Sequence, residues 1–399
     1  MNRTKQTAAS IILTCICLLL LGSCSSSIPL KEGQTIRVQF YSQGAKITET
    51  VFEHKDRFTL PEPPVRDGYT FNGWWVTTEQ EGIVEFTRDW LSEHLEEGTV
   101  KVNARWLETS YTFEQQELTT VGVIQDGTIW GDWFFKFHST GLCYVYSRTT
   151  GKKVGGFTLN RADDFKPHCN AVCFSNRYYA EGDEFPLLYA NIYNNYNKDE
   201  FDDKRAGMVC VYRIQRNGTQ FSTTLVQIIR VSFADDQPWR SKWDTESQTW
   251  TDRSPWGNFI VDTDNSKLWV FVTRDANLTT RFFCFDLPEV QPDSLGMTLT
   301  EADVIRTFDI PYSWYLQGAC YHQGKIYSTE GLGTDANPSR IRVVDLEHGI
   351  EDCVIDLYAD HAYMREAEYI DFADGAFWYG DYKKINNNPT AFLYRMTGI

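Results

Sequence analysis

EYIDFADGAFWYG, residues 368–380, is the stretch that decides the fold. Two aromatic-rich apolar runs flank Asp374-Gly375, and an Asp-Gly pair in that setting is typical of a tight β-hairpin turn. Four further segments combine an apolar run, a short turn and a second run carrying Trp or Tyr; in the second segment the partner run, FPLLYA, comes late. They are VGVIQDGTIWG (121–131), NAVCFSNRYY (170–179), NFIVDTDNSKLWVF (258–271) and GACYHQGKIYS (318–328). The chain therefore repeats one hairpin unit five times.

Each hairpin is followed by a third apolar run, and the first four are followed by a fourth. The third runs are LCYVYS (142–147), MVCVYR (208–213), RFFCFD (281–286), RIRVVD (340–345) and AFLYRM (391–396). Units of four strands repeated in series are typical of a β-propeller. We therefore predict an all-β chain with a five-bladed propeller over residues 110–399. The alternatives are a sixth blade inside the long third unit and an irregular β-sandwich.

The fifth unit lacks a fourth strand because the chain ends after its third run. A spare strand, YTFEQQELT (111–119), precedes the first unit. If this strand forms the outer edge of the last blade, the ring closes and no sheet edge is left open to other chains. We predict that pairing.

The N-terminus has the form of a secretory signal. Arg3 and Lys5 precede an apolar run over residues 11–22, which is shorter than the roughly 20 residues that span a bilayer. Leu21-Gly22-Ser23-Cys24 resembles the bacterial lipobox, which implies a lipoprotein signal peptide over residues 1–23, acylation of Cys24 and a tether over 24–35. The resemblance implies a protein anchored by lipid to the bacterial cell envelope, periplasmic or surface-exposed. An ordinary secretory signal is the alternative.

Residues 36–107 form a separate unit. A strand-like run, IRVQFYS, is followed by a Pro-rich turn, then by GYTFNGWW (68–75) and finally by ARW (104–106). These motifs resemble the internalin-type B-repeat, also called the Listeria–Bacteroides repeat. The resemblance implies a small β-grasp-like module of surface proteins, with Trp74, Trp75 and Trp106 in its core.

Charge and cysteine usage narrow the function. The formal net charge of −16 disfavours nucleic acid, whose phosphates require a basic surface. Seven cysteines follow Cys24, an odd number, and most lie within strand-like apolar runs. We expect them to be buried free thiols that act as small hydrophobic residues. They are Cys143, Cys169, Cys173, Cys210, Cys284, Cys320 and Cys353.

The loops that join one predicted blade to the next are rich in aromatic and polar residues. In a propeller such loops gather around one end of the axis, and loops on a rigid scaffold commonly carry function. Flat aromatic faces beside polar groups suit sugar rings. We therefore predict a ligand-binding mouth, although the aromatic loops could instead pack on themselves. Its aromatic residues would be Trp239, Trp243, Trp250, Trp256 and Trp314.

Polar residues stand where the inner strands are predicted to begin. They occupy equivalent places in four repeats, where a core strand would carry apolar side chains. We predict that they face the mouth, either as a polar lining that holds water or an ion or as part of the recognition site. They are His168, Asn170, Asn258, Gln317, Glu366 and Glu368.

These features predict non-catalytic binding of a glycan or a partner protein. The alternative is a glycoside hydrolase or lyase that uses acids at the channel mouth, since glycoside hydrolysis needs two carboxylates. Glu366 and Glu368 come from one strand, and the other repeats offer no matching acid there, which disfavours a hydrolase. His168-Cys169-x-x-x-Cys173 is a weak zinc motif, because strand alternation would separate the His from the two Cys. We predict no metal and no cofactor.

Overall fold

The computed structural model describes residues 27–78, 81–95, 98–121, 124–165, 168–191, 208–233, 243–244, 249–250, 258–273, 279–313, 315–361, 365–385 and 388–398. Strands dominate these residues. The α-helices among them are short: α1 (Arg88–Glu93), α2 (Ala162–Phe165) and α3 (Leu357–His361). None of the described helices is long and apolar enough to cross a membrane.

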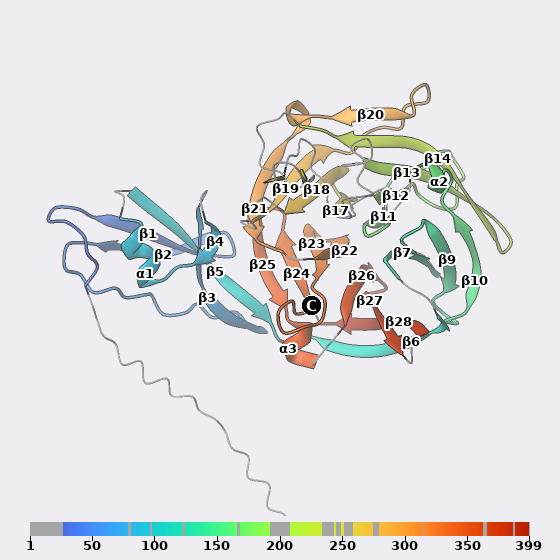
Figure 1. The fold of residues 1–399 in the computed structure, drawn as a ribbon. Helices are drawn as coiled ribbons and strands as arrows, with labels where there is room; N and C mark the ends of the chain where they lie inside the picture. The colour runs from blue at the N-terminus through green and yellow to red at the C-terminus, as the bar shows by residue number, and fades with distance from the viewer. Residues whose placement is uncertain are drawn as a thin grey trace, which may run out of the picture.

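The larger part of the chain is a β-propeller, with sheets standing around a common axis (Figure 1). Four blades are separate sheets, each built outward from an inner strand. The first two are β7 (Asp126–Trp130), β8 (Trp133–Phe137), β9 (Leu142–Ser147) and β10 (Lys153–Thr158), then β11 (Val172–Phe174), β12 (Leu188–Asn191), β13 (Met208–Asn217) and β14 (Gln220–Val231). The other two are β17 (Asn258–Asp262), β18 (Lys267–Thr273), β19 (Thr279–Asp286) and β21 (Arg306–Pro311), then β26 (Glu366–Ala373), β27 (Ala376–Ile385), β28 (Asn388–Thr397) and β6 (Thr112–Val121).

A further group of four strands stands between β21 and β26 in the chain and belongs to a larger sheet. It consists of β22 (Leu316–His322), β23 (Lys325–Glu330), β24 (Arg340–Asp345) and β25 (Ile350–Ile355). These strands continue through β25 into the N-terminal module, so the whole sheet has nine strands.

The predicted ring closure is confirmed. β6 pairs antiparallel with β28, from Thr112 opposite Thr397 to Val121 opposite Thr390, with one register shift. The N-terminal strand of the propeller thus forms the outer edge of its last sheet, although 285 residues separate Thr112 from Thr397.

The hairpin turns follow the prediction in the last two units. Asp374 and Gly375 both have positive φ, and so do Gln323 and Gly324, as a tight hairpin turn of the favoured type requires. The first unit differs: Asp126 and Gly127 begin strand β7, and the turn falls at Gly131-Asp132. Asp126 is buried and accepts a hydrogen bond from the backbone N–H of Val172 on β11, so tertiary contact overrides the local turn signal.

Two small additions depart from the predicted four-strand pattern. β20 (Gly296–Leu299) runs parallel to β14 and adds a fifth strand to that sheet. β15 (Trp243–Asp244) and β16 (Thr249–Trp250) form a two-stranded ladder of their own in the long connection that leads to β17.

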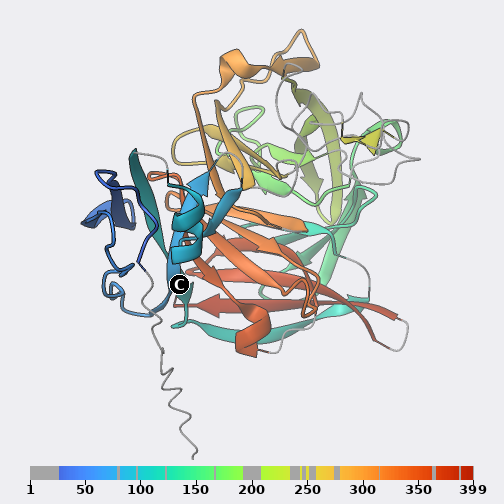
Figure 2. The same cartoon turned by 60° about the vertical axis from the view of Figure 1, so that its left-hand side comes forward.

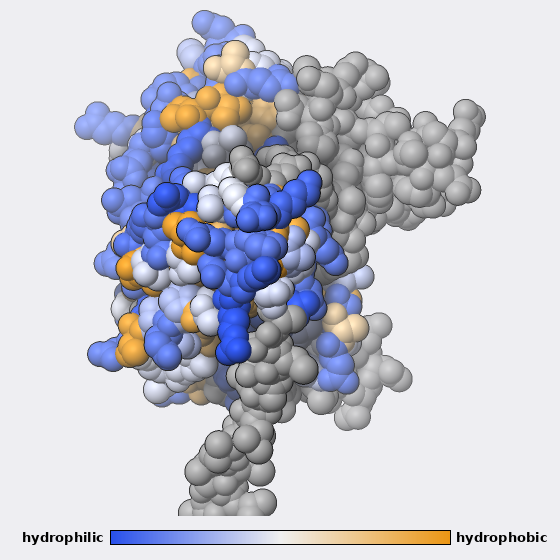
Figure 3. All heavy atoms as spheres, turned by 90° about the vertical axis from the view of Figure 1, so that its left-hand side faces the viewer, coloured by the Kyte–Doolittle hydropathy of each residue, from blue (hydrophilic) through white to orange (hydrophobic). Residues whose placement is uncertain are grey.

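The N-terminal module consists of β1 (Ile36–Ser42), β2 (Ala45–Phe52), β3 (Tyr69–Thr78), β4 (Gly82–Glu85), α1 and β5 (Gly98–Glu108). Trp74 and Trp106 are buried in its core, as predicted, and Trp74 packs edge-on against Phe40 with ring centroids 4.9 Å apart. Trp75 is only partly buried, and the guanidinium of Arg105 lies 4.6 Å from the centre of its ring. The outward face of the module is mostly hydrophilic, with apolar atoms in small separate groups (Figure 3).

The module lies against the edge of the propeller (Figure 2). The two parts share a hydrophobic core and are joined by ion pairs. β5 bridges to β25 at Leu107 and Val354. Arg66 donates to the carboxylate of Asp352 at 2.9 and 3.1 Å, and Arg105 donates to Glu351 at 2.5 Å. Both arginines come from the module and both acids from β25, so the contact fixes the module against the edge of the propeller.

Candidate functional site

Amide and carboxyl side chains at the start of the inner strands hydrogen-bond from one strand to the next. Asn170, just before β11, donates to the side-chain oxygen of Asn258 on β17 at 3.2 Å. Asn258 donates to the backbone oxygen of Gln317 on β22. Gln317 in turn donates to the carboxylate of Glu366 on β26 at 2.8 Å. These three bonds link four consecutive inner strands.

Two further bonds complete the circle through β7. Gln125, just before β7, donates to Glu368 on β26 at 3.1 Å. Asp126 on β7 accepts the backbone N–H of Val172 on β11 at 2.7 Å. We call this closed set of hydrogen bonds around the axis the axial belt. It is made by Gln125, Asp126, Asn170, Val172, Asn258, Gln317, Glu366 and Glu368.

Gly318 shows how tightly the strands approach at the belt. A Cβ placed on it would lie 2.6 Å from Oδ1 of Asp126 and 2.7 Å from the backbone oxygen of Glu368. Real Cβ contacts are not this short, and one of the two neighbours is rigid backbone. Only glycine fits where β22, β7 and β26 meet.

Burial disfavours the charged form of each carboxyl group of the belt. It raises the pKa of Glu366, and it raises the pKa of Glu368 well above its ordinary value, with further contributions from Glu366 and Asp126. Burial also raises the pKa of Asp126 well above its ordinary value, although the N–H groups of Gly127 and Val172 act in the opposite direction. A shift toward the neutral form suits a belt that holds strands together, because it lowers the cost of burying these groups.

The structure brings most of the predicted polar mouth residues together. Asn170, Asn258, Gln317, Glu366 and Glu368 meet at the axis. Their hydrogen bonds run to one another and to Gln125 and Asn191, so their first role is to join strands. His168 lies just before them and is partly buried; burial lowers its pKa to about 4, so its imidazole is neutral at neutral pH.

The predicted aromatic residues are only partly described. Trp239, Trp256 and Trp314 lie outside the described residues, and so does Cys24. The backbones of Trp243 and Trp250 stand directly opposite each other in the β15–β16 ladder. This ladder is followed, after residues 251–257, by the start of β17 at Asn258, which belongs to the axial belt.

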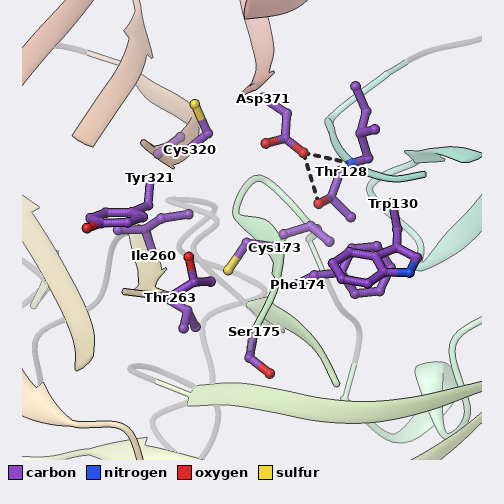
Figure 4. Close-up of a pocket in the computed structure, with 14 residues that line it drawn as sticks. Thr128, Trp130, Cys173, Phe174, Ser175, Ile260, Thr263, Cys320, Tyr321 and Asp371 are labelled. Atoms are coloured by element: carbon purple, nitrogen blue, oxygen red, sulfur yellow. Dashed lines mark hydrogen bonds between the residues drawn. The ribbon is translucent and has the colours of Figure 1, made fainter. Parts of the chain in front are cut away.

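Sequence reasoning missed a cavity at the other end of the same strands. We call it the axial pocket; it has a volume of about 150 Å³ (Figure 4). Its wall takes residues from, or directly after, each of the strands β7, β11, β17, β22 and β26. The lining residues are Thr128, Ile129, Trp130, Val172, Cys173, Phe174, Ser175, Ile260, Val261, Thr263, Ala319, Cys320, Tyr321 and Asp371. The signal that could have revealed it is Asp371, an acid within the apolar run EYIDFA.

The seven predicted thiols are free and buried. Burial raises the pKa of each, so they are protonated and unreactive at neutral pH. Within the described parts of the chain, no group of three or more His, Cys, Asp or Glu side chains is arranged to hold a metal ion.

Comparison with known proteins adds a family match and two distant likenesses. No curated protein matches the chain. The crystal structure of Myxococcus xanthus glutaminyl cyclase is similar at 12% identity with a TM-score of 0.39, covering 72% of this chain and 95% of that one. Kuenenia stuttgartiensis hydrazine synthase is similar at 13% identity with a TM-score of 0.35, covering 66% of this chain and 77% of that one. Likenesses at this level carry no argument about activity. Residues 37–94 match the model of the Listeria–Bacteroides repeat domain, in agreement with the resemblance of residues 36–106.

Proposed function

We propose that this chain is a non-catalytic binding protein of the bacterial cell envelope, and that the loops around the axial belt bind a glycan. The observation that carries the proposal is the belt itself. Its amides and carboxyls are used to join inner strands, and its acids are buried with raised pKa values. Recognition then falls to the loops that surround a rigid, already satisfied centre.

The propeller in this proposal has five blades. Four are separate sheets, and β22–β25 supply the fifth although their sheet runs on into the module. The belt supports this count, because β22 takes its place between β17 and β26 through the backbone and side chain of Gln317. The β-grasp-like description of the module is supported by α1, whose Leu91 is fully buried in the core that the sheet covers.

Tryptophans near the start of β17 are the proposed sugar-stacking groups. Trp243 and Trp250 are register partners in β15–β16, and directly opposite residues lie on the same face of an antiparallel ladder. A pair of aromatic residues on one face is a suitable platform for a pyranose ring, whose C–H groups stack on aromatic rings while its hydroxyls take hydrogen bonds.

A glycan array tests this proposal with the soluble chain from residue 28. Trp243→Ala and Trp250→Ala are each expected to weaken binding at least tenfold without changing the thermal midpoint. Trp130→Ala is the matched control, because Trp130 lies at the opposite end of the inner strands and is partly exposed. If no glycan binds but a co-purified protein requires Trp243 and Trp250, the partner is a protein instead.

A glycoside hydrolase or lyase remains the second candidate, favoured by one observation. The acids of the belt come from two inner strands, β7 and β26, and Asp126 contributes to the raised pKa of Glu368. A raised pKa suits a general acid. Polysaccharide cleavage that is lost in Glu368→Gln would establish catalysis and refute the non-catalytic proposal.

The lipid anchor is proposed from the lipobox-like sequence that ends at Cys24. When the full-length chain is expressed in a bacterium, we expect the protein to sediment with membranes. Cys24→Ala is expected to abolish acylation and to release the protein or leave its signal uncleaved. This part of the proposal would be refuted if Cys24→Ala left membrane attachment unchanged and mass spectrometry found no lipid on the mature N-terminus of the unmodified sequence.

A further inference from the structure

The axial pocket is a cavity whose lining carries a negatively charged side chain and no positively charged one. Asp371 is its one Asp or Glu side chain, and none of its lining residues is Lys, Arg or His. Four hydroxyl-bearing side chains also line its wall: Thr128, Ser175, Thr263 and Tyr321, whose hydroxyl donates to Asp264. A ligand that fits this wall carries a positive charge or none.

Asp371 is held in a fixed position at the pocket. One oxygen, Oδ2, accepts the backbone N–H of Ile129 at 2.7 Å and the hydroxyl of Thr128 at 3.1 Å. The other, Oδ1, accepts the backbone N–H of Phe372 at 2.8 Å. All three donors are uncharged, so they fix the orientation of the carboxylate without neutralising its charge. It enters the pocket from β26 (Figure 4).

Aromatic rings stand on two sides of this carboxylate. Trp130 and Phe174 lie on one side, with ring centroids 6.0 Å apart, and Tyr321 lies on the other (Figure 4). Trp130 also meets Tyr178 edge-on at 6.3 Å, and both rings are partly exposed, so the aromatic wall continues to the surface. Aromatic faces attract organic cations through their quadrupoles.

We propose that the axial pocket binds a small organic ammonium ion. Its positive group would pair with Asp371, and its apolar body would lie between Trp130, Phe174 and Tyr321. The volume of about 150 Å³ sets the size, since an engineered apolar cavity of that volume binds benzene. This site lies at the opposite end of the inner strands from the proposed glycan-binding loops and is independent of them.

The charged and titratable groups around Asp371 fit this ligand. Burial raises the pKa of Asp371 to about 6, which leaves it mostly ionised at pH 7. Cys173, Cys320, Asp126 and Tyr369 face it from β11, β22, β7 and β26, and burial raises the pKa of each. Arg148 lowers the pKa of Asp371 but is itself paired with Asp374.

Isothermal titration calorimetry with two matched probes tests the proposal. Benzylammonium carries the charge, and benzyl alcohol has nearly the same shape without it. Benzylammonium is expected to saturate one site with a Kd at or below about 1 mM. Benzyl alcohol is expected to bind at least tenfold more weakly. This comparison needs no variant, so it does not depend on a mutant that folds.

Two substitutions then assign the site. Asp371→Asn keeps the shape and is expected to weaken benzylammonium at least tenfold while leaving benzyl alcohol unchanged. Because Asp371 has a pKa of about 6, affinity for benzylammonium should fall about tenfold from pH 7 to pH 5. Asp126→Asn should keep that pH dependence, and Asp371→Asn should remove it. The proposal would be overturned if the two probes bound equally, if neither showed saturable binding, or if Asp371→Asn kept full affinity for benzylammonium.

Discussion

Arg342→Ala is expected to destabilise the protein by about 3–5 kcal/mol, because it removes the centre of a buried charge network. Arg342 is only 3% exposed and donates to Glu330 on β23 at 2.8 Å and to Glu351 on β25. Arg105 of the module donates to the same Glu351. Without the guanidinium, the buried Glu330 loses the cation that it pairs with, which is far more costly than losing a surface pair.

The network also predicts a dependence on pH. Burial alone would raise the pKa of Glu351, but Arg105 and Arg342 outweigh it and lower the pKa below its ordinary value. A carboxyl whose pKa is depressed by folding contributes stability above its unfolded pKa and loses it as the pH falls through the folded value. Arg342→Ala should therefore destabilise the protein more at pH 7 than at pH 3.

Urea unfolding followed by tryptophan fluorescence measures both effects. Arg37→Ala is the matched control, because the Arg37–Glu49 pair is exposed and should leave the unfolding midpoint nearly unchanged. A loss below about 1 kcal/mol in Arg342→Ala at pH 7 would show that the network contributes little to stability.

Local turn chemistry explains why much of the propeller could be predicted from sequence. Asp374-Gly375 and Gln323-Gly324 accept the positive φ values of a tight turn, and their flanking runs pair as expected. Asp126-Gly127 is the same residue pair as Asp374-Gly375 but lies in a strand, because the carboxyl of Asp126 is buried against β11. A turn motif is reliable only where nothing from a distant strand binds its side chain.

Long-range contacts explain what could not be predicted. The polar residues Asn170, Asn258 and Gln317 could be placed near one another by their positions in the repeats. Their mutual hydrogen bonds depend on distances between strands that no single repeat contains. The ion pair of Arg66 with Asp352 joins positions 286 residues apart and has no local signal.

The axial pocket was missed for a related reason. Its wall takes one to four residues from each inner strand, or from the turn just after it, and most of them are ordinary core residues. Asp371 is the only acid among them, and one acid in a strand signals a cavity only once the strands that surround it are known.

A disulfide between β6 and β28 is expected to raise the stability of the propeller by about 5–6 kcal/mol in the chain-entropy model, because it closes a very long loop. Thr112 and Thr397 are register partners whose hydroxyl oxygens lie 2.5 Å apart, and neither side chain is buried. In Thr112→Cys/Thr397→Cys the two thiols would replace those hydroxyls. The gain should disappear when a reductant is added, and the two single variants are the controls.

Formation of this disulfide is the most direct test of the closed ring. The chain from residue 28 retains only the seven buried native thiols, whose raised pKa values keep them from competing. Mild oxidation of the double variant, followed by peptide mass spectrometry under non-reducing conditions, is predicted to give one intramolecular link between positions 112 and 397. If that link does not form, or if only disulfide-joined dimers appear, the first strand of the propeller does not complete its last sheet.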